Sequence, residues 1–314
     1  MAGLMKPDGS LRGAESINDY YKSAFGLATA GLNPETDTML DYINKTFLTA
    51  DGDLIGDGCP WFDVFRIYPH TWILMAAILR ARFDIAERIA GFLDAFQDPS
   101  TGGYYGTLHA REKEGQQEMM TTGLSGIAML WAGRREAALK TGQWMKNVMD
   151  AQPDITEGLY FVWHHDKGLV TEFPDEERKS YRVDPQEPGQ KYYNYGIPAA
   201  FLACLYGQTG DREWLDLAGR YLHATAHCRD DFHRSPQSGK VGWGAAWLYR
   251  ITGDPAARAI VERVYGHLAS VQHAEGWWDA MNVYEQSAVT SPEPGMDITG
   301  EFMAHLSWMQ SVLS

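Results

Sequence analysis

The chain has 314 residues, and its 27 Lys and Arg against 41 Asp and Glu give a formal net charge of −14. This charge repels phosphate backbones, and no apolar run approaches the roughly 18 residues of a membrane span, so the composition excludes a nucleic-acid binder and a transmembrane helix. Hydrophobic residues make up 45%, as in an ordinary globular protein, but 11 Trp and 16 Tyr exceed what a minimal core requires.

Apolar residues recur at intervals of three and four along most of the chain, which predicts helices. The expected helices cover 14–29, 33–48, 67–80, 82–97, 118–132, 134–151, 191–206, 211–227, 241–250, 255–272 and 298–313. Strand-like alternation is scarce, and no Pro/Ser-rich or charged linker divides the chain. We therefore expect one all-α domain over 1–314, with a short flexible tail at about 1–12.

The connections between these helices alternate between short and long. The short turns include Thr-Gly-Asp at 209–211 and again at 252–254, where Gly ends one helix and Asp caps the next. These two copies begin 43 residues apart, which indicates a repeated helical hairpin. The long connections are 49–66, 98–117, 152–190, 228–240 and 273–297, and the charged segment within 152–190 suggests a lid.

A glutamine followed by glycine and an aromatic residue recurs where long connections begin. Gln97 precedes Gly-Gly-Tyr, Gln152 precedes Gly158 and Tyr160, and Gln272 opens a full Q-x-x-x-G-x-W. We expect the same local role three times: Gln near a helix end, Gly in the turn, and the aromatic ring packed over the hairpin.

Tandem hairpins with Q-x-x-x-G-x-W elements resemble the α/α-toroid superfamily, which includes terpenoid cyclases, protein prenyltransferases, six-hairpin glycosidases and sugar epimerases. The resemblance implies an (α/α)6 barrel, a toroid with all long loops on one face and the chemistry among them. Two features depart from it: the Asp-x-Asp-Asp proton donor of squalene-cyclase-like enzymes is missing, and no Asp, Cys and His zinc triad of the prenyltransferase kind is evident.

In the first long connection, Pro69 fits a first helical position, which places His70 in the first turn of an inner helix. A histidine there tends to stay neutral, and with Asp63 and Arg66 nearby it could serve as base or electrophile. The alternative is that Asp63 pairs with Arg66 to cap the helix. Trp61 is a candidate substrate platform in the same connection.

In the second long connection, Tyr104 and Tyr105 follow two glycines that let the backbone approach a ligand, and His109 is a further binding candidate. The alternatives are packing between hairpins for the tyrosines and a solvated side chain for His109.

The longest connection holds Trp163, His164, His165 and Asp166 in sequence. Alternation predicts a short strand with Trp163 and His165 on one face, and Asp166 could orient a histidine that works as acid or base. The alternative is a hydrated surface loop.

The remaining candidates lie in the later connections and at the starts of the later helices. Asp231 and His233 form a possible acid/base pair without an obvious third metal ligand, and Glu301 is expected to point inward while Asp297 caps the last helix. Candidate binding residues in these regions are Tyr192, Asn194, Trp277 and Trp278.

These residues favour an enzyme that uses carboxylate, His and Tyr acid/base groups in an aromatic cavity, without a cofactor or metal. The principal hypothesis is isomerisation, dehydration or cyclisation of a small, partly apolar metabolite of terpenoid or polyketide type. The alternative is an intracellular carbohydrate-active enzyme, either a sugar epimerase or a six-hairpin glycoside hydrolase. A non-catalytic helical-repeat scaffold is a third hypothesis. The three Cys fit no even set of disulfides, and the sequence shows no secretory signal, so we expect a cytoplasmic protein. A homo-oligomer is possible.

Overall fold

The structure is a computed structural model that describes residues 1–56, 62, 64–279 and 295–314. Its contacts divide the chain into two compact units. Unit 1 comprises Met1–Ala95 with Leu268–Trp308, and unit 2 comprises Phe96–His267 with Met309–Ser314. Each unit is described by itself, and the expected single domain stays a prediction.

Unit 1 contains two helical hairpins, α1 (Tyr21–Thr29) with α2 (Asn33–Thr46) and α3 (Tyr68–Leu79) with α4 (Phe83–Asp94), together with α13 (Met296–Leu313) up to Trp308. The first helices of the hairpins, α1 and α3, pack together, and the ring of Phe25 meets the edge of Trp72 at 5.4 Å between centroids. Residues 1–12, the expected flexible tail, contain η1 (Ala2–Leu4) and a Met5–Leu11 bridge, and Leu11 is buried.

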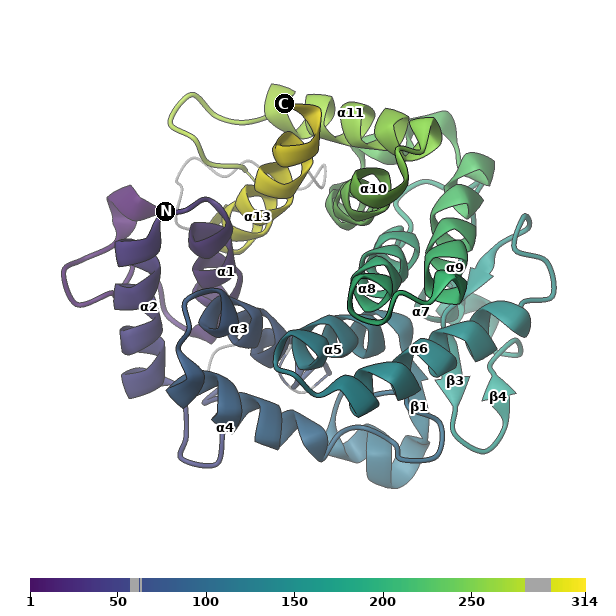
Figure 1. The fold of residues 1–314 in the computed structure, drawn as a ribbon, viewed down its shortest axis with the longest axis horizontal. Helices are drawn as coiled ribbons and strands as arrows, with labels where there is room; N and C mark the ends of the chain where they lie inside the picture. Colours follow the sequence, from purple (N-terminus) through teal and green to yellow (C-terminus); the bar gives the residue numbers. More distant parts are fainter. Residues whose placement is uncertain (57–61, 63, 280–294) are drawn as a thin grey trace. The chain divides into compact units, whose positions relative to one another are not determined.

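Unit 2 continues the pattern with α5 (Met119–Trp131) and α6 (Arg135–Asp150), α8 (Tyr193–Thr209) and α9 (Arg212–His223), and α10 (Gly239–Thr252) and α11 (Pro255–Ser270). The first helix of each of these hairpins is buried on nearly all sides, whereas α6 and α9 bury one face, as their sequence patterns predict. Figure 1 shows α6 lying against α5 and α9 against α8.

The short turns of unit 2 form as predicted. Gly210 and Gly253 both adopt left-handed backbone angles at helix C-caps, and Asp211 caps α9 by accepting a hydrogen bond from the Glu213 amide at 3.0 Å. The predicted repeat of the Thr-Gly-Asp hairpin turn is therefore confirmed.

Small residues set the spacing of α5, α8 and α10. A Cβ built on Gly123 would lie 2.5 Å from Ile197 Cγ2, and one built on Gly196 would lie 2.2 Å from the Lys240 carbonyl oxygen. These close approaches align the three helices so that their first turns lie at a common end of unit 2.

The long connection 152–190 is more structured than a loop. It contains β2 (Leu159–Tyr160), β3 (Val162–His164), β4 (Gly168–Leu169), η4 (Asp175–Glu177), α7 (Arg178–Tyr181) and β5 (Arg182–Val183). Antiparallel pairs join β3 to β4 and to β1 (Gln116–Glu118), which directly precedes α5, and join β2 to β5. The lid interpretation stays a prediction, but β3 is anchored to the start of α5.

The three predicted glutamines share one role. The Nε2 of Gln97 donates to the Gly102 carbonyl oxygen at 3.1 Å, that of Gln152 to Tyr160 at 2.9 Å, and that of Gln272 to Gly276 at 3.1 Å. Each amide thus closes the turn that follows its helix, because an irregular backbone otherwise leaves carbonyl groups unpaired.

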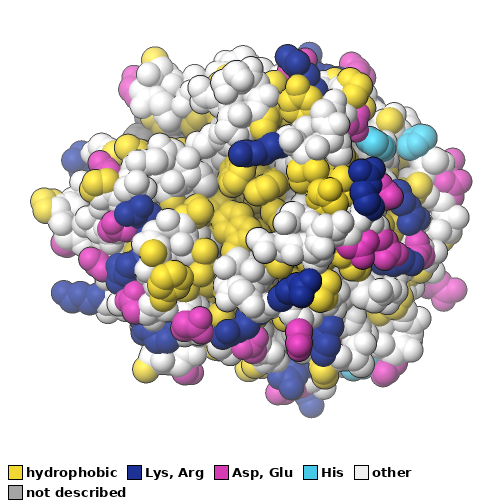
Figure 2. Space-filling model, in the orientation of Figure 1, with side chains coloured by type: hydrophobic (Ala, Val, Ile, Leu, Met, Phe, Trp, Pro, Cys, Tyr) yellow, Lys and Arg dark blue, Asp and Glu magenta, His cyan; other side chains and the backbone are white. Residues whose placement is uncertain are grey.

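On the face displayed in Figure 2, Lys and Arg side chains are interspersed with Asp and Glu, without a broad basic patch. Across the described ranges, no helix combines the length and apolar character needed to cross a membrane.

Candidate functional site

The first turns of α5, α8 and α10 bring ionisable and polar side chains together in unit 2. Glu118 precedes α5, Lys191 precedes α8, and Lys240 lies in the first turn of α10. Lys191 is the charged neighbour that acts on the Glu118 carboxyl, and Lys240 Nζ lies 5.8 Å from the centre of the Tyr193 ring. We call this group, with the polar residues described next, the helix-start cluster.

Glu118 holds the carboxyl group of the cluster. Burial raises its pKa, and the charge of Lys191 opposes this rise without cancelling it. Its Oε2 atom is buried and, within the described residues, has no hydrogen-bond partner. The backbone of Glu118 is fixed, since it pairs with Val162 of β3. A carboxyl with a raised pKa on a rigid backbone is suited to act as a general acid.

Three further side chains of the cluster carry buried polar atoms. Thr121 and Ser125 lie on one side of α5 at a spacing of four residues, and Asn194 lies in the first turn of α8. All three are at most 1% exposed. Among the described residues, neither hydroxyl oxygen and neither polar atom of the Asn194 amide has a hydrogen-bond partner. Buried polar groups are normally paired, so this concentration indicates a site for a polar ligand.

Unit 1 holds a separate buried charge network around Lys22. Its Nζ lies 2.8 Å from Asp297 and 2.7 Å from Glu301, and 5.3 and 5.7 Å from the ring centres of Tyr21 and Tyr68. Burial lowers the pKa of Lys22, but the two carboxylates outweigh this effect and hold it well above its usual value. Glu301 is buried, as predicted for an inward carboxylate, and its partner is a lysine that the sequence did not reveal.

The predicted His70 group has a different partner from the one expected. Trp61 and Asp63 lie outside the described residues. Arg66 forms its ion pair with Asp53, and Asp53 Oδ1 also lies 3.2 Å from His70 Nε2. His70 Nδ1 lies 3.0 Å from the Arg66 carbonyl oxygen, and the imidazole stacks on Phe92 with ring centres 4.8 Å apart. Burial lowers the pKa of His70 even though Asp53 opposes it, which favours the neutral ring, and a role of His70 as base or electrophile stays a prediction.

The predicted Trp163–Asp166 segment forms the end of β3 and the turn after it. His165 Nδ1 lies 2.8 Å from the Tyr105 hydroxyl, and His165 Nε2 lies 3.0 Å from Asp166. Tyr105 also donates a hydrogen bond to Asp98. Burial raises the pKa of Asp98, but hydrogen bonds from Ser100 and Tyr105 outweigh this effect and lower the pKa to about 2. His165 and Asp166 are paired as predicted. Trp163 keeps its indole N–H buried and unpartnered among the described residues.

Asp231 and His233 do not form the predicted pair. The Asp231 carboxylate is half exposed and binds Arg229 at 3.1 Å, while His233 Nδ1 contacts the Asp230 carbonyl oxygen at 2.9 Å. Both residues lie in η6 (Asp230–Arg234), whose tight turn directs neighbouring side chains apart. Arg263 adds a bond to Asp230 at 2.8 Å, so arginines neutralise both aspartates.

Several predicted binding residues are engaged in packing. Tyr104 is fully buried, and the Tyr192 hydroxyl donates to the Glu187 carbonyl oxygen at 3.0 Å. Trp278 is buried in unit 1, where its Nε1 donates to the Leu268 carbonyl oxygen at 2.8 Å. Trp277 stacks on His273, and His109 is exposed beside Glu114 at 3.4 Å. The positions of Tyr104 and His109 match the packing and solvated alternatives raised for them, whereas binding roles for Tyr192, Trp277 and Trp278 stay predictions.

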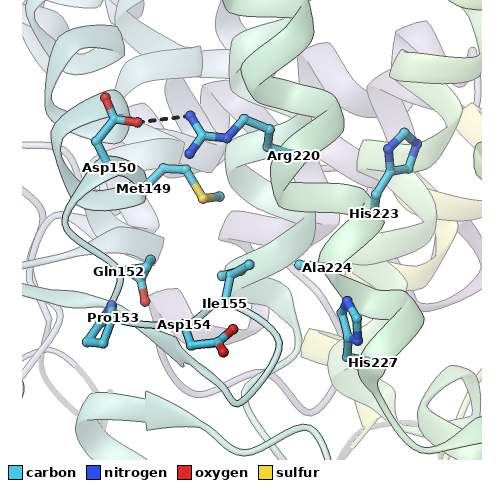
Figure 3. Close-up of a pocket in the computed structure, with 10 residues that line it drawn as sticks. All are labelled: Met149, Asp150, Gln152, Pro153, Asp154, Ile155, Arg220, His223, Ala224 and His227. Carbon is cyan, nitrogen blue, oxygen red and sulfur yellow. Dashed lines mark hydrogen bonds and ion pairs between the residues drawn. The ribbon is translucent and has the colours of Figure 1, made fainter.

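A surface pocket lies between the C-terminal ends of α6 and α9 in unit 2 (Figure 3). Arg220 and Asp150 form an ion pair across it at 2.9 Å, and His227 and Asp154 line its other end. His223, also in the lining, pairs with Asp254 at 2.6 Å. Because these charges neutralise one another and the side chains are exposed, the pocket offers less catalytic potential than the helix-start cluster.

The comparisons with known proteins concern the fold. No family model matches the chain, and no curated protein matches it in sequence. Solved structures do match. The GH76A alpha-1,6-mannanase from Salegentibacter sp. HEL1_6 has a TM-score of 0.66 at 13% identity, covering 98% of this chain and 95% of its own. A structure of D-mannose isomerase has a TM-score of 0.66 at 14% identity, covering 98% and 90%. A GH76 alpha-mannanase from Bacteroides thetaiotaomicron has a TM-score of 0.65 at 10% identity, covering 95% and 88%.

This likeness confirms the predicted fold class, the all-α (α/α)6 toroid of the six-hairpin glycosidases and sugar epimerases. It also corrects the principal functional hypothesis. The structures named above are mannanases and a mannose isomerase, so a terpenoid- or polyketide-type cyclase or dehydratase is not supported, and the carbohydrate-active alternative is favoured instead.

Proposed function

We propose that the protein is a carbohydrate-active enzyme that transfers protons on a mannose-type sugar at the helix-start cluster. The observation that carries this proposal is the set of buried, unpartnered polar atoms in the first two turns of α5 and α8, together with the raised-pKa carboxyl of Glu118 directly before α5. The fold shared with mannanases and a mannose isomerase narrows the ligand class to sugars.

Polar ligands with many hydroxyl groups suit this set of side chains. Thr121, Ser125 and Asn194 together offer hydroxyl and amide donors and acceptors in a dry environment. Each unpaired buried polar group costs about 1–3 kcal/mol, and a sugar hydroxyl, which both donates and accepts, removes that cost when it binds. The unpaired groups therefore select a polyhydroxylated ligand over an apolar one.

Glu118 is the proposed acid/base residue. Because its pKa is raised, the carboxyl carries a proton over a wider pH range than an ordinary glutamic acid. It can pass this proton to the carbonyl oxygen of an open-chain sugar while the C2 proton passes to solvent water. Lys191 next to it, and Lys240 over Tyr193, supply positive charge at the same helix ends.

The positive charges favour isomerisation or epimerisation of a single sugar. Such reactions proceed through an enediolate. Two ammonium groups and the positive dipole ends of the helix starts would stabilise its developing negative charge. Glycoside hydrolysis instead builds positive charge on the sugar ring and uses two carboxyl groups roughly 5–10 Å apart. Within the described part of unit 2, the Glu118 pKa responds to Lys191 and to no second carboxylate.

Hydrolysis of α-mannosides is the second candidate, supported by the likeness to the mannanases. One of these was solved as an inactive variant in which two adjacent aspartates were replaced by asparagine, in complex with alpha-1,6-mannotriose. In this sequence the single adjacent aspartate pair is Asp230–Asp231. Its side chains are 96% and 49% exposed and bind arginines, which is a poor setting for an acid pair.

The test incubates the purified protein with a panel of aldoses, including D-mannose, in D2O and separately with alpha-1,6-mannotriose. We expect deuterium at C2 of the recovered aldose or of its epimer, or at C1 of a ketose product, detected by NMR. Release of mannose from the trisaccharide without deuterium exchange would replace isomerisation by the second candidate. A folded protein that does neither on the whole panel would refute the proposal.

A further inference from the structure

We propose that His164, His165 and Asp166 form a binding site for a divalent metal ion of the zinc type. The three residues follow one another at the end of β3 in unit 2, and each offers a ligand atom within 4.8 Å of the others. Pairing of β3 with β1 and β4 holds the backbone of His164, and the His165 amide donates to the Gly115 carbonyl oxygen at 2.9 Å. The inference is independent of the sugar chemistry proposed above.

A hydrogen-bond chain fixes the tautomer of His165. Asp98 Oδ1 accepts bonds from the amides of Ser100 and Thr101 at 2.8 and 3.0 Å, and Oδ2 accepts the Tyr105 hydroxyl proton. With its proton committed to Asp98, the Tyr105 oxygen accepts from His165 Nδ1 at 2.8 Å. The lone pair of the neutral imidazole is then on Nε2. Metal-binding histidines characteristically have their other N–H held in this way.

The Nε2 lone pair faces a second acceptor. Asp166 Oδ2 lies 3.0 Å from His165 Nε2, and two acceptors at this distance repel unless a cation, either a proton or a metal ion, lies between them. His164 contributes to the same space. A Cβ built on Gly115 would lie 3.0 Å from His164 Nε2 and 3.1 Å from His165 Nε2. Gly115 has φ +69°, a left-handed conformation that favours glycine, and its lack of a side chain leaves room beside the two imidazole nitrogens.

The chemistry of the donors points to zinc. Two imidazole nitrogens and one carboxylate are a common three-residue set for Zn²⁺, which keeps a fourth position for water or a ligand. His164 Nδ1 accepts the Asp166 amide at 3.1 Å, which leaves the proton of the neutral ring on Nε2. Coordination through His164 Nε2 moves that proton and breaks this hydrogen bond. Metal binding therefore has a signature at the Asp166 amide.

The test is calorimetric titration of the EDTA-treated full chain with Zn²⁺ alone. We expect one ion per chain, with at least a 100-fold loss of affinity in His165→Ala and Asp166→Ala. Tyr105→Phe keeps every ligand but removes the acceptor for His165 Nδ1, so a 10–100-fold loss is expected. His109→Ala is the matched control, because His109 is exposed and ion-paired with Glu114 outside the cluster.

Two further measurements keep the test decisive. Circular dichroism and thermal unfolding establish that each variant is folded, and ¹⁵N NMR should show the Asp166 amide signal moving as Zn²⁺ is added to the wild-type protein. Wild-type protein that takes up no Zn²⁺, or a folded His165→Ala variant with wild-type affinity, would overturn the proposal. The contact between His165 and Asp166 would then be an ordinary ion pair.

Discussion

Replacing Glu118 by glutamine separates catalysis from stability. The change keeps the shape of the side chain and removes its exchangeable acid proton. General acid catalysis contributes about 10²–10⁴ in rate, so we expect kcat/KM on the responsive sugar to fall by that factor, or about 3–5 kcal/mol in activation free energy. The measurement is C2 deuterium exchange or product formation by NMR, with Glu157→Gln, an exposed residue of the same unit, as the control.

The same variant has an opposite effect on stability. Burial raises the folded-state pKa of Glu118 above its unfolded value, so its contribution to stability is present below the unfolded pKa and is lost as pH rises through the folded pKa. Above the raised pKa the ionised carboxylate is buried at a cost that the amide avoids. Urea denaturation should therefore show Glu118→Gln equal to wild type in acid and at least as stable at pH 7.

The pH dependence of the rate provides an independent check. Since the acid must carry its proton, wild-type activity should fall as pH rises through the raised pKa of Glu118, and this alkaline limb should be lost in the variant. A Glu118→Gln protein with full activity, or with the same alkaline limb, would remove Glu118 from the mechanism. A variant that is both inactive and less stable at pH 7 would show that the carboxyl is structural.

Three further predictions concern buried groups. Lys22→Met should lower the free energy of unfolding by about 3–5 kcal/mol in urea denaturation, because two buried carboxylates lose their partner. The control Lys146→Met, at the surface, should leave the free energy of unfolding unchanged, and equal losses in the two variants would contradict the ion-pair argument. Asn194→Leu should raise KM at least 10-fold yet stabilise the fold by about 1–3 kcal/mol, and an unaltered KM would argue against sugar binding there. Gly196→Ala should cost about 1–3 kcal/mol, since its Cβ would meet the Lys240 carbonyl oxygen at 2.2 Å, whereas Gly207→Ala on the same helix meets nothing within 4 Å and should be neutral or stabilising.

The candidate site was only partly predictable from the sequence. The sequence predicts Asn194 as a binding residue and Glu301 as an inward carboxylate, and both are buried. The sequence does not single out Glu118, because a carboxylate before a helix is usually an ordinary cap or dipole partner, and no local pattern shows which side of α5 lacks partners. Asp231 and His233 were paired on sequence proximity, but the tight turn of η6 separates their side chains.

The sequence by itself determined the helices, their pairing into hairpins and the glutamine-closed turns. These features depend on interactions between residues at most a few positions apart: apolar periodicity, capping side chains and left-handed glycines. Tertiary structure decided which charges are buried and which partners they have. Lys22 meets Asp297 across 275 positions, and the charge of Lys191 acts on Glu118 from the next hairpin. Which helix ends come together decides these partners. Burial raises the pKa of Glu118 and leaves the Asn194 amide unpaired, and it exists only once those helix ends have packed.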